Sequence, residues 1–231
     1  ESIGTTGTGS IFIKDYDTNT IIQAINVTGS LVTGSGTDTI TINPANLAEN
    51  THYYIDIDAT AFPDFAGNYD DITPLKETWD FTTEDNTAPL KPQINTPGSG
   101  STIKDTTPTI SGTGAELGGT IRVYSGSTLL CTDSSVIQSG ADYIWSCTSS
   151  TLSPEGYTFP LTATHTDSSS NVSNPTNIHP VTLDNTTPSV STFSPADEAT
   201  DVATTTNLTI TFTESIGTTG TGSIFIKDYD T

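Results

Sequence analysis

The first 18 residues of the chain, Glu1–Thr18, return letter for letter as Glu214–Thr231. Eighteen identical positions in a row do not arise by chance, so we interpret the chain as one period of a tandem array with a repeat of 213 residues. An array that repeats on the scale of a domain is typical of a long fibre. The repeat therefore favours a spacing or holding role and argues against an enzyme.

Two proline-containing seams divide the period into units. The pattern D-N-T-x-P occurs at 85–89 and again at 184–188, 99 residues further along. Proline prevents the preceding strand from continuing and stiffens the chain at that point. We therefore expect three parts: unit A (residues 1–87), which lacks its first strands; unit B (residues 88–186), which is complete; and an opening segment (residues 187–231), which holds the first strands of the next copy of unit A.

Apolar residues alternate with polar ones along much of the chain, which is the period of a β-strand with one buried face. No segment carries an apolar stripe of helical period long enough for a helix, and the length of each unit suits two packed sheets. We predict an all-β fold of tandem β-sandwiches, one complete and one split, with Trp79 and Trp145 in the cores. The alternating positions are Ile40, Ile42, Tyr53, Ile55, Ile57, Trp79, Phe81, Ile121, Val123, Leu129, Cys131, Tyr143, Trp145, Cys147, Tyr157, Phe159, Leu161, Ala163, Leu208, Ile210 and Phe212.

The charge balance limits the partners of the chain. It carries 27 acidic and 6 basic residues, a net charge of −21, which repels nucleic acid and anionic membranes. No apolar run has the length of a membrane span. Close carboxylates repel one another unless counter-ions lie between them. The charge therefore favours calcium, a cation that prefers oxygen ligands, or alternatively a solvated, halotolerant surface.

The chain contains two cysteines, Cys131 and Cys147, and no methionine. Two cysteines in a chain otherwise resistant to oxidation indicate a disulfide and an extracellular setting. Both fall on predicted strands that the 132–141 loop joins as a hairpin, so we expect a cross-strand bridge. The alternative is two buried thiols.

Several short motifs, weak one by one but specific in their order and spacing, resemble the bacterial Ig-like domains of large surface proteins. The resemblance covers essentially the whole chain. It implies tandem Ig-like β-sandwiches that form the stalk of a giant repetitive adhesin at the cell surface, and it says nothing of the ligand at the tip. The motifs are Ser194–Asp197, Asn207–Glu214, Asp64–Asn68 and Trp79–Thr83 for the split unit, and Pro108–Gly112, Trp145, Gly156–Thr158 and Asp167–Asn171 for unit B.

The loops of an Ig-like sandwich gather at its two ends, so the linker from one unit is expected to meet two loops of the next. Both joints then hold the same oxygen donors: Asp-Asn on the linker, Glu in one loop and D-x3-N in the other. Calcium takes about 6–8 oxygen ligands, and some related adhesin extenders bind it at their joints, so we predict Ca²⁺ here. The alternative is that these residues only form and cap turns. The predicted ligands are Asp85, Asn86, Glu116, Asp167 and Asn171 at one joint, and Asp184, Asn185, Glu214, its copy Glu1, Asp64 and Asn68 at the other.

Three functions fit the sequence, and none is enzymatic, because no catalytic motif is present. The first is a stalk segment whose joints are stiffened by calcium. The second is the repeat of a self-assembling extracellular filament, in which residues 187–213 complete unit A of a neighbouring copy; contacts between 187–213 and 19–87 within one chain would refute it. The third is a carbohydrate-binding module, which exposed coplanar aromatic side chains would favour.

Overall fold

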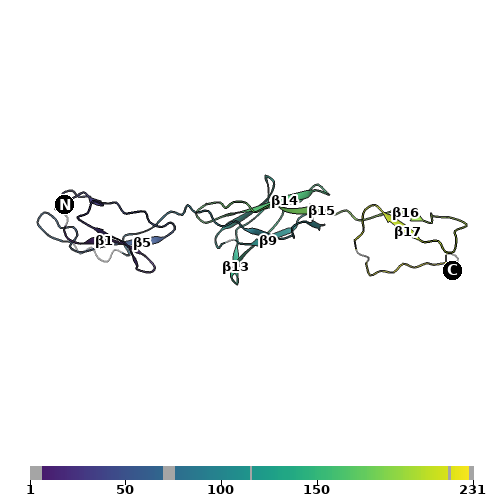
Figure 1. Cartoon of the computed structure of the whole chain (residues 1–231), viewed down its shortest axis with the longest axis horizontal. Coiled ribbons are helices and arrows are strands. Elements are labelled where there is room, and N and C mark those ends of the chain that lie inside the picture. The colour runs from purple at the N-terminus through teal and green to yellow at the C-terminus, as the bar shows by residue number, and fades with distance from the viewer. Residues whose placement is uncertain (1–6, 70–75, 115, 218–219, 229–231) are drawn as a thin grey trace.

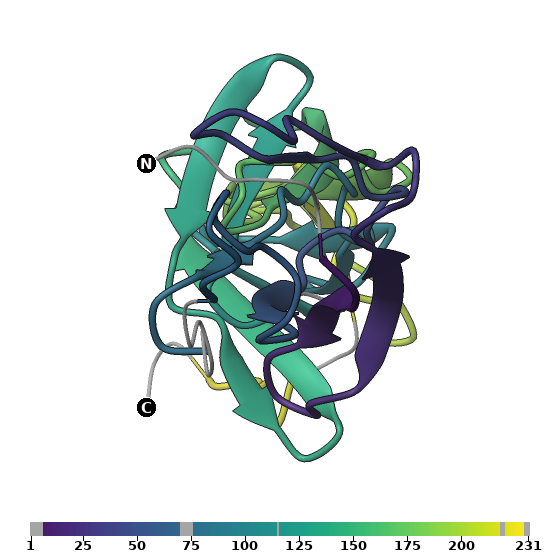
Figure 2. The ribbon, with the colours of Figure 1, turned by 90° about the vertical axis from the view of Figure 1, so that its left-hand side faces the viewer.

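The computed structural model describes residues 7–69, 76–114, 116–217 and 220–228. Strands, turns and bends make up the described part of the chain, with no helix, so the predicted all-β fold is confirmed. Unit A, unit B and the opening segment lie end to end in sequence order (Figure 1), and they overlap when viewed along the long axis (Figure 2). Within the described residues, no helix has the length and apolar character needed to cross a membrane.

Unit B is a β-sandwich of two sheets. The order of the first sheet is β11-β10-β14-β15-β8, in which β8 lies parallel to β15 and the other neighbours are antiparallel. The order of the second is β12-β13-β9-β7. These strands are β7 (Gln93–Thr96), β8 (Ser101–Ile103), β9 (Thr109–Thr113), β10 (Thr120–Ser125), β11 (Thr128–Asp133), β12 (Ile137–Ser139), β13 (Asp142–Thr148), β14 (Thr158–Thr166) and β15 (His179–Leu183).

The core of unit B follows the predicted alternation closely. Ile121 and Val123 of β10 are fully buried, and Trp145 of β13 is 2% exposed. Phe159, Leu161 and Ala163 are buried on one face of β14, while Tyr157, just before the strand, is 48% exposed. Removing this much apolar surface from water is the main force that holds the two sheets together.

Strand β11 departs from the predicted alternation. Val123 pairs with Cys131 but Tyr124 pairs with Leu129, so Leu130 is the extra residue of a β-bulge. The bulge places Leu130 in the core, at 8% exposure, and leaves Leu129 47% exposed. The prediction that Leu129 shares the buried face was wrong, because the bulge reverses the facing of the residues before it.

Unit A contains a single four-stranded antiparallel sheet of order β2-β1-β5-β6 and a short hairpin of β3 and β4. The strands are β1 (Ser10–Asp15), β2 (Ile21–Asn26), β3 (Val32–Thr33), β4 (Thr41–Ile42), β5 (His52–Ile57) and β6 (Asp80–Thr82). Ile11, Ile13, Tyr53, Ile55 and Ile57 form the core with the hairpin and its flanking residues.

The last strand of unit A contradicts the predicted core. Trp79, which directly precedes β6, is 44% exposed, and Phe81 within it is 36% exposed. In the matching strand of unit B, β15, Val181 and Leu183 are 0% and 2% exposed because they pack in the core between the two sheets, and β8 also pairs along the outer edge of this strand. In the described part of unit A only the short β3–β4 hairpin stands where unit B has a four-stranded second sheet, and no strand pairs with the outer edge of β6, so Trp79 and Phe81 are left partly exposed.

The opening segment forms a two-stranded antiparallel hairpin of β16 (Val190–Ser194) and β17 (Thr209–Phe212). Among the described residues, these strands pair with each other and with no strand of unit A or unit B. Phe193 is 59% exposed, and Leu208 and Ile210 are 62% and 45% exposed. The hairpin is therefore a pair of strands whose apolar side chains have no core.

Candidate functional site

The linker between units A and B is held from the unit A side by Glu49, a residue that the sequence analysis missed. Glu49 Oε2 accepts hydrogen bonds from the backbone N–H of Asn86, at 3.3 Å, and from Thr87 Oγ1, at 2.8 Å. Thr87 N also donates to Asp85 Oδ1 at 3.1 Å, which bends the linker into a local turn. Asp85 and Asn86 thus take part in ordering the linker.

The same linker is held from the unit B side by Asn171, in the loop between β14 and β15. Asn171 Nδ2 donates to the backbone carbonyl of Asp85 at 2.9 Å. The structure therefore brings together three residues of the predicted set, namely Asp85, Asp167 and Asn171, because Asp167 lies in the same loop and contacts Asn171. Hydrogen bonds on both sides restrict the freedom of the linker.

Asp167 and Asn171 form a turn that recurs in unit A as Asp64 and Asn68. In both turns the aspartate N–H donates to the asparagine carbonyl, at 3.0 Å in unit B and 2.9 Å in unit A. The asparagine N–H donates to one carboxylate oxygen, at 2.8 and 2.7 Å, and its Nδ2 donates to the other, at 3.1 and 2.7 Å. Two sequences that share only D-x3-N thus build the same closed turn.

These turns stabilise the ionised aspartates. In unit A, the hydrogen bond from the Asn68 side chain, followed by that from its backbone, lowers the pKa of Asp64 below its ordinary value. In unit B, partial burial by itself raises the pKa of Asp167, but the hydrogen bonds from Asn171 outweigh it and the net pKa is lowered. Both carboxylates therefore stay anionic without a cation.

The linker that follows unit B repeats the first contact. The backbone N–H of Asn185 donates to both carboxylate oxygens of Glu155, each at 3.0 Å. Glu155 lies three residues before β14, as Glu49 lies three residues before β5. This shared position before the equivalent strand is the signal by which the sequence could have revealed both glutamates.

The remaining predicted calcium ligands do not come together at one site. Asp184 and Glu214 line one surface hollow beside the second linker, and Glu214 Oε1 is buried there with no hydrogen-bond partner among the described residues. Glu116 lines a different hollow, with Leu90 and the fully buried His165. Asp64 and Asn68 belong to the far unit, and Glu1 lies outside the described residues.

The donor set fits calcium only if neutral oxygen atoms supply most of the ligands. In the described part of the chain, no three Asp, Glu, His or Cys side chains gather closely enough to hold a metal ion. A calcium ion at the first joint would therefore have to draw on the Asp167 carboxylate, backbone carbonyls, the oxygen of an asparagine and water. The turn-forming role of Asp64 and Asp167, by contrast, is directly visible in their hydrogen bonds.

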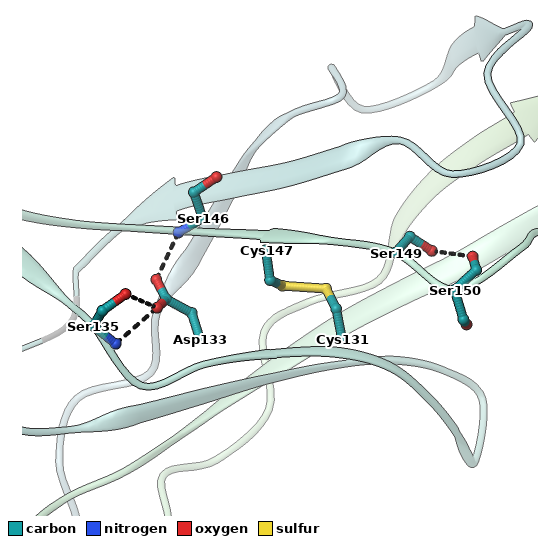
Figure 3. The surroundings of a disulfide bond; sticks show 7 residues. All are labelled: Cys131, Asp133, Ser135, Ser146, Cys147, Ser149 and Ser150. Atoms are coloured by element: carbon teal, nitrogen blue, oxygen red, sulfur yellow. Dashed lines mark hydrogen bonds between the residues drawn. A yellow bond between two sulfur atoms is a disulfide. The ribbon is translucent and has the colours of Figure 1, made fainter.

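The predicted disulfide between Cys131 and Cys147 is present, with Cα atoms 5.8 Å apart (Figure 3). Its predicted setting within a hairpin was wrong. Strand β12 forms inside the 132–141 loop and pairs with β13, while β11 belongs to the other sheet, so the bond joins the two sheets. By closing a loop of 16 residues it stabilises unit B by about 3 kcal/mol on the chain-entropy model.

Next to the disulfide, the buried Asp133 makes a second tie between the sheets (Figure 3). Its Oδ2 accepts from the backbone N–H of Ser146 on β13 at 2.7 Å, and its Oδ1 accepts from Ser135 N and Oγ, each at 2.8 Å. Burial alone raises the pKa of Asp133, but these hydrogen bonds outweigh it and lower the pKa. The two sheets of unit B are therefore joined between β11 and β13 by a disulfide and by a charged hydrogen bond. The sequence predicted the disulfide but not the role of Asp133.

The chain was compared with curated proteins and with solved structures. Among curated proteins, none matches the chain. Solved structures similar to it include the crystal structure of Rst D1-D2 (13% identity, 78% of this chain and 86% of that chain, TM-score 0.39). Another is the fibronectin(III)-like modules of Clostridium thermocellum CbhA (10% identity, 78% of this chain and 80% of that chain, TM-score 0.31). Superpositions this loose carry no argument about function.

The family model described as bacterial Ig-like domain matches residues 3–83 and 184–231, which together make up more than half of the chain. This family is a structural one, and no catalytic family was found. Together with the disulfide it indicates an extracytoplasmic protein. The two matched segments are unit A and the opening segment, and by them the chain belongs to the family of bacterial Ig-like domains.

Proposed function

We propose that the chain is a stalk segment of a repetitive bacterial surface fibre or adhesin, which holds a binding domain away from the cell. The observation that carries the proposal is the end-to-end arrangement of the units about a linker that is hydrogen-bonded on both sides (Figure 1). A spacer needs length and limited bending at its joints. Ordered sandwiches in line supply the length, and the contacts of Glu49 and Asn171 limit the bending.

Calcium at the joints is the second element of the proposal. It is supported by the net charge of −21, by the carboxylates that flank both linkers, and by the hollow that Asp184 shares with Glu214, whose buried Oε1 has no hydrogen-bond partner in the part of the chain that the structure describes. An ion bound between a linker and the following unit would remove hinge freedom beyond what the hydrogen bonds remove. In this role calcium stiffens a linker that the hydrogen bonds already order.

The spacer role is tested by small-angle scattering of the full chain at low concentration. Replacing Glu49 and Asn171 by Ala together removes both contacts to the linker and should loosen the first joint, shorten the maximum dimension and broaden the distance distribution. Asn68→Ala is the matched control, because it removes the same bond within the turn, whereas no bond from Asn68 to a linker is present among the described residues. Dimensions unchanged in the double variant would contradict a joint held by these contacts.

Calcium is tested by thermal unfolding with EDTA, with CaCl₂ and with NaCl at equal ionic strength. An ion that binds only the folded state stabilises it more as the free ion concentration rises above the dissociation constant, so CaCl₂ should raise the melting temperature far more than NaCl. Asp167→Asn should remove most of the difference between CaCl₂ and EDTA at the first joint. An equal response to both salts would mean that the acidic surface is only being screened.

A further inference from the structure

Unit B shows which strands a complete sandwich of this protein contains. Its first sheet runs β11-β10-β14-β15 and is extended by β8, and its second sheet consists of β12, β13, β9 and β7. Unit A has a four-stranded sheet of the same order, β2-β1-β5-β6, which corresponds to β11-β10-β14-β15. The short hairpin of β3 and β4, between β2 and β5 in the chain, corresponds to β12 and β13. Within its described residues it has no counterpart of β7, β8 or β9. The three strands that open unit B are thus the ones that unit A lacks.

The opening segment contains counterparts of two of the three strands that unit A lacks, β7 and β9. Strands β16 and β17 pair antiparallel with a shift in register, as β7 and β9 do. Their sequences also correspond: Thr209-Ile210-Thr211 of β17 matches Thr109-Ile110-Ser111 of β9. The family model matches unit A and the opening segment but not unit B, as expected if the two are pieces of one kind of domain.

The burial of matching side chains shows that both pieces are incomplete. Ile110 in unit B is fully buried, whereas Ile210 at the matching position is 45% exposed. Leu183 on the last strand of unit B is 2% exposed, whereas Trp79 and Phe81 beside and within the last strand of unit A are 44% and 36% exposed. Unit A therefore presents an apolar edge, and the opening hairpin presents apolar side chains of the kind that cover this edge in unit B.

We propose that residues 187–213 of one copy of this repeat complete unit A of the next copy. In the completed sandwich β17 lies beside β4, as β9 lies beside β13. The chain that follows β16 lies parallel to β6, as β8 lies parallel to β15, and covers Trp79 and Phe81. The partner is a second copy of the same repeat, and the occupant of the open edge is its opening hairpin.

The proposal also assigns a partner to the second linker. Asn171 donates to the carbonyl of Asp85 because unit B follows that linker directly. When the opening segment joins unit A of the next copy, the turn of Asp64 and Asn68 comes to the equivalent position beside Asp184. Asn68 Nδ2 then donates to the Asp184 carbonyl, so every joint in the array has the same contacts.

The test compares the present chain with a rephased chain, made of residues 88–213 followed directly by 1–87. Its new junction has the native sequence, because Thr213-Glu1 reads the same as Thr213-Glu214. Both chains are studied in EDTA, so the result is independent of calcium and of the stalk role. We expect the rephased chain to be monomeric and its Trp79 to be inaccessible to a fluorescence quencher. We expect the present chain to associate head to tail as its concentration rises.

Two variants of the rephased chain compare a charge on the two faces of β17. Ile210→Asp places a charge in the proposed core, and we expect it to restore the quenching of Trp79 and lower the melting temperature. Thr211→Asp, on the opposite face of the same strand, should leave both unchanged. If Trp79 stays as accessible in the rephased chain as in the present one, or if the two aspartate variants behave alike, the proposal is overturned.

Discussion

The same six residues occur twice in this protein with opposite outcomes. At 10–15 they form β1, the inner strand of the unit A sheet between β2 and β5, where Ile11 and Ile13 are 0% and 2% exposed. At 223–228 the identical sequence forms no strand, and Ile224 and Ile226 are 86% and 85% exposed. The two copies have the same strand propensity and the same apolar pattern, so neither property decides whether the segment forms a buried strand.

The difference between the copies is the set of neighbours. Ile11 pairs with Ile25 on one side and with Ile57 on the other, and both neighbouring strands bring apolar side chains to one core. Among the described residues, no strand pairs with 223–228. A strand gains most of its stability from packing and pairing with its neighbours, so an isolated one has nothing to offset its loss of entropy.

The sharpest test of this comparison removes the same side chain from each copy. Ile11→Ala should lower the free energy of unfolding of unit A by about 2–5 kcal/mol, because it leaves a cavity in a closed core. Ile224→Ala should change it by less than about 0.5 kcal/mol, as surface substitutions do. Hydrogen exchange of peptides from β5, followed by mass spectrometry, measures both. Equal protection in the two variants would mean that the neighbours of β1 do not stabilise it.

A second matched pair tests close backbone approach. A Cβ on Gly7 would lie 2.0 Å from the backbone oxygen of Thr60, whereas nothing lies within 4 Å of one on the matching Gly220. Gly7→Ala should destabilise unit A by about 1–3 kcal/mol, the usual cost of overpacking. Gly220→Ala should be neutral. Thermal unfolding followed by circular dichroism measures the effect, and a neutral Gly7→Ala would show that the segment before β1 is not held against Thr60.

The pH dependence of stability tests the contribution of Asp133 to the complete unit B. The pKa of Asp133 is lowered in the folded unit B, so its contribution is present above the unfolded value of about 3.9 and is lost as the pH falls through the folded value. Asp133→Asn should cost about 1–3 kcal/mol at neutral pH, and this difference from the parent should shrink below about pH 4. Chemical denaturation in a Trp79→Phe background, monitored by Trp145 fluorescence, reports on unit B, with the exposed Asp142→Asn as control.

The smallest effect is expected from the lysine that both copies share. Lys14 pairs with the Asp56 carboxylate on β5, and this hydrogen bond, opposed by partial desolvation, raises the Lys14 pKa. Lys14→Gln should cost about 0.2–1 kcal/mol, the range of partly exposed ion pairs. This contribution is present below pH 10.5 and is lost as the pH rises through the higher folded value. Lys227→Gln, at the exposed copy, should have no effect on the unfolding of unit A; an equal loss would indicate non-specific charge effects.

Most of the secondary structure of the complete unit was predictable. The alternation of Ile121 with Val123 and of Phe159 with Leu161 gave both the strands and their buried face correctly. The disulfide was predictable as a pair but not as a link between sheets, because the 132–141 loop hides the short strand β12. The bulge at Leu130 was not predictable either, since one extra residue leaves no mark on an alternating pattern.

The joints were half predictable. The linker and the D-x3-N loop do meet, through Asn171 and Asp85, as the loop topology of a sandwich requires. Glu116 and Asp184 line separate hollows, and the glutamate that contacts each linker is Glu49 or Glu155, neither of which was predicted. Sequence shows which residues carry oxygen atoms, but the direction in which a loop presents them depends on its turns.

The sequence by itself determined the all-β class and the repeat, because each depends on spacing along the chain. Only the tertiary structure decided which apolar strands are buried. Burial requires surface from distant parts of the chain, and identical residues at 10–15 and 223–228 meet that surface in one place and not in the other.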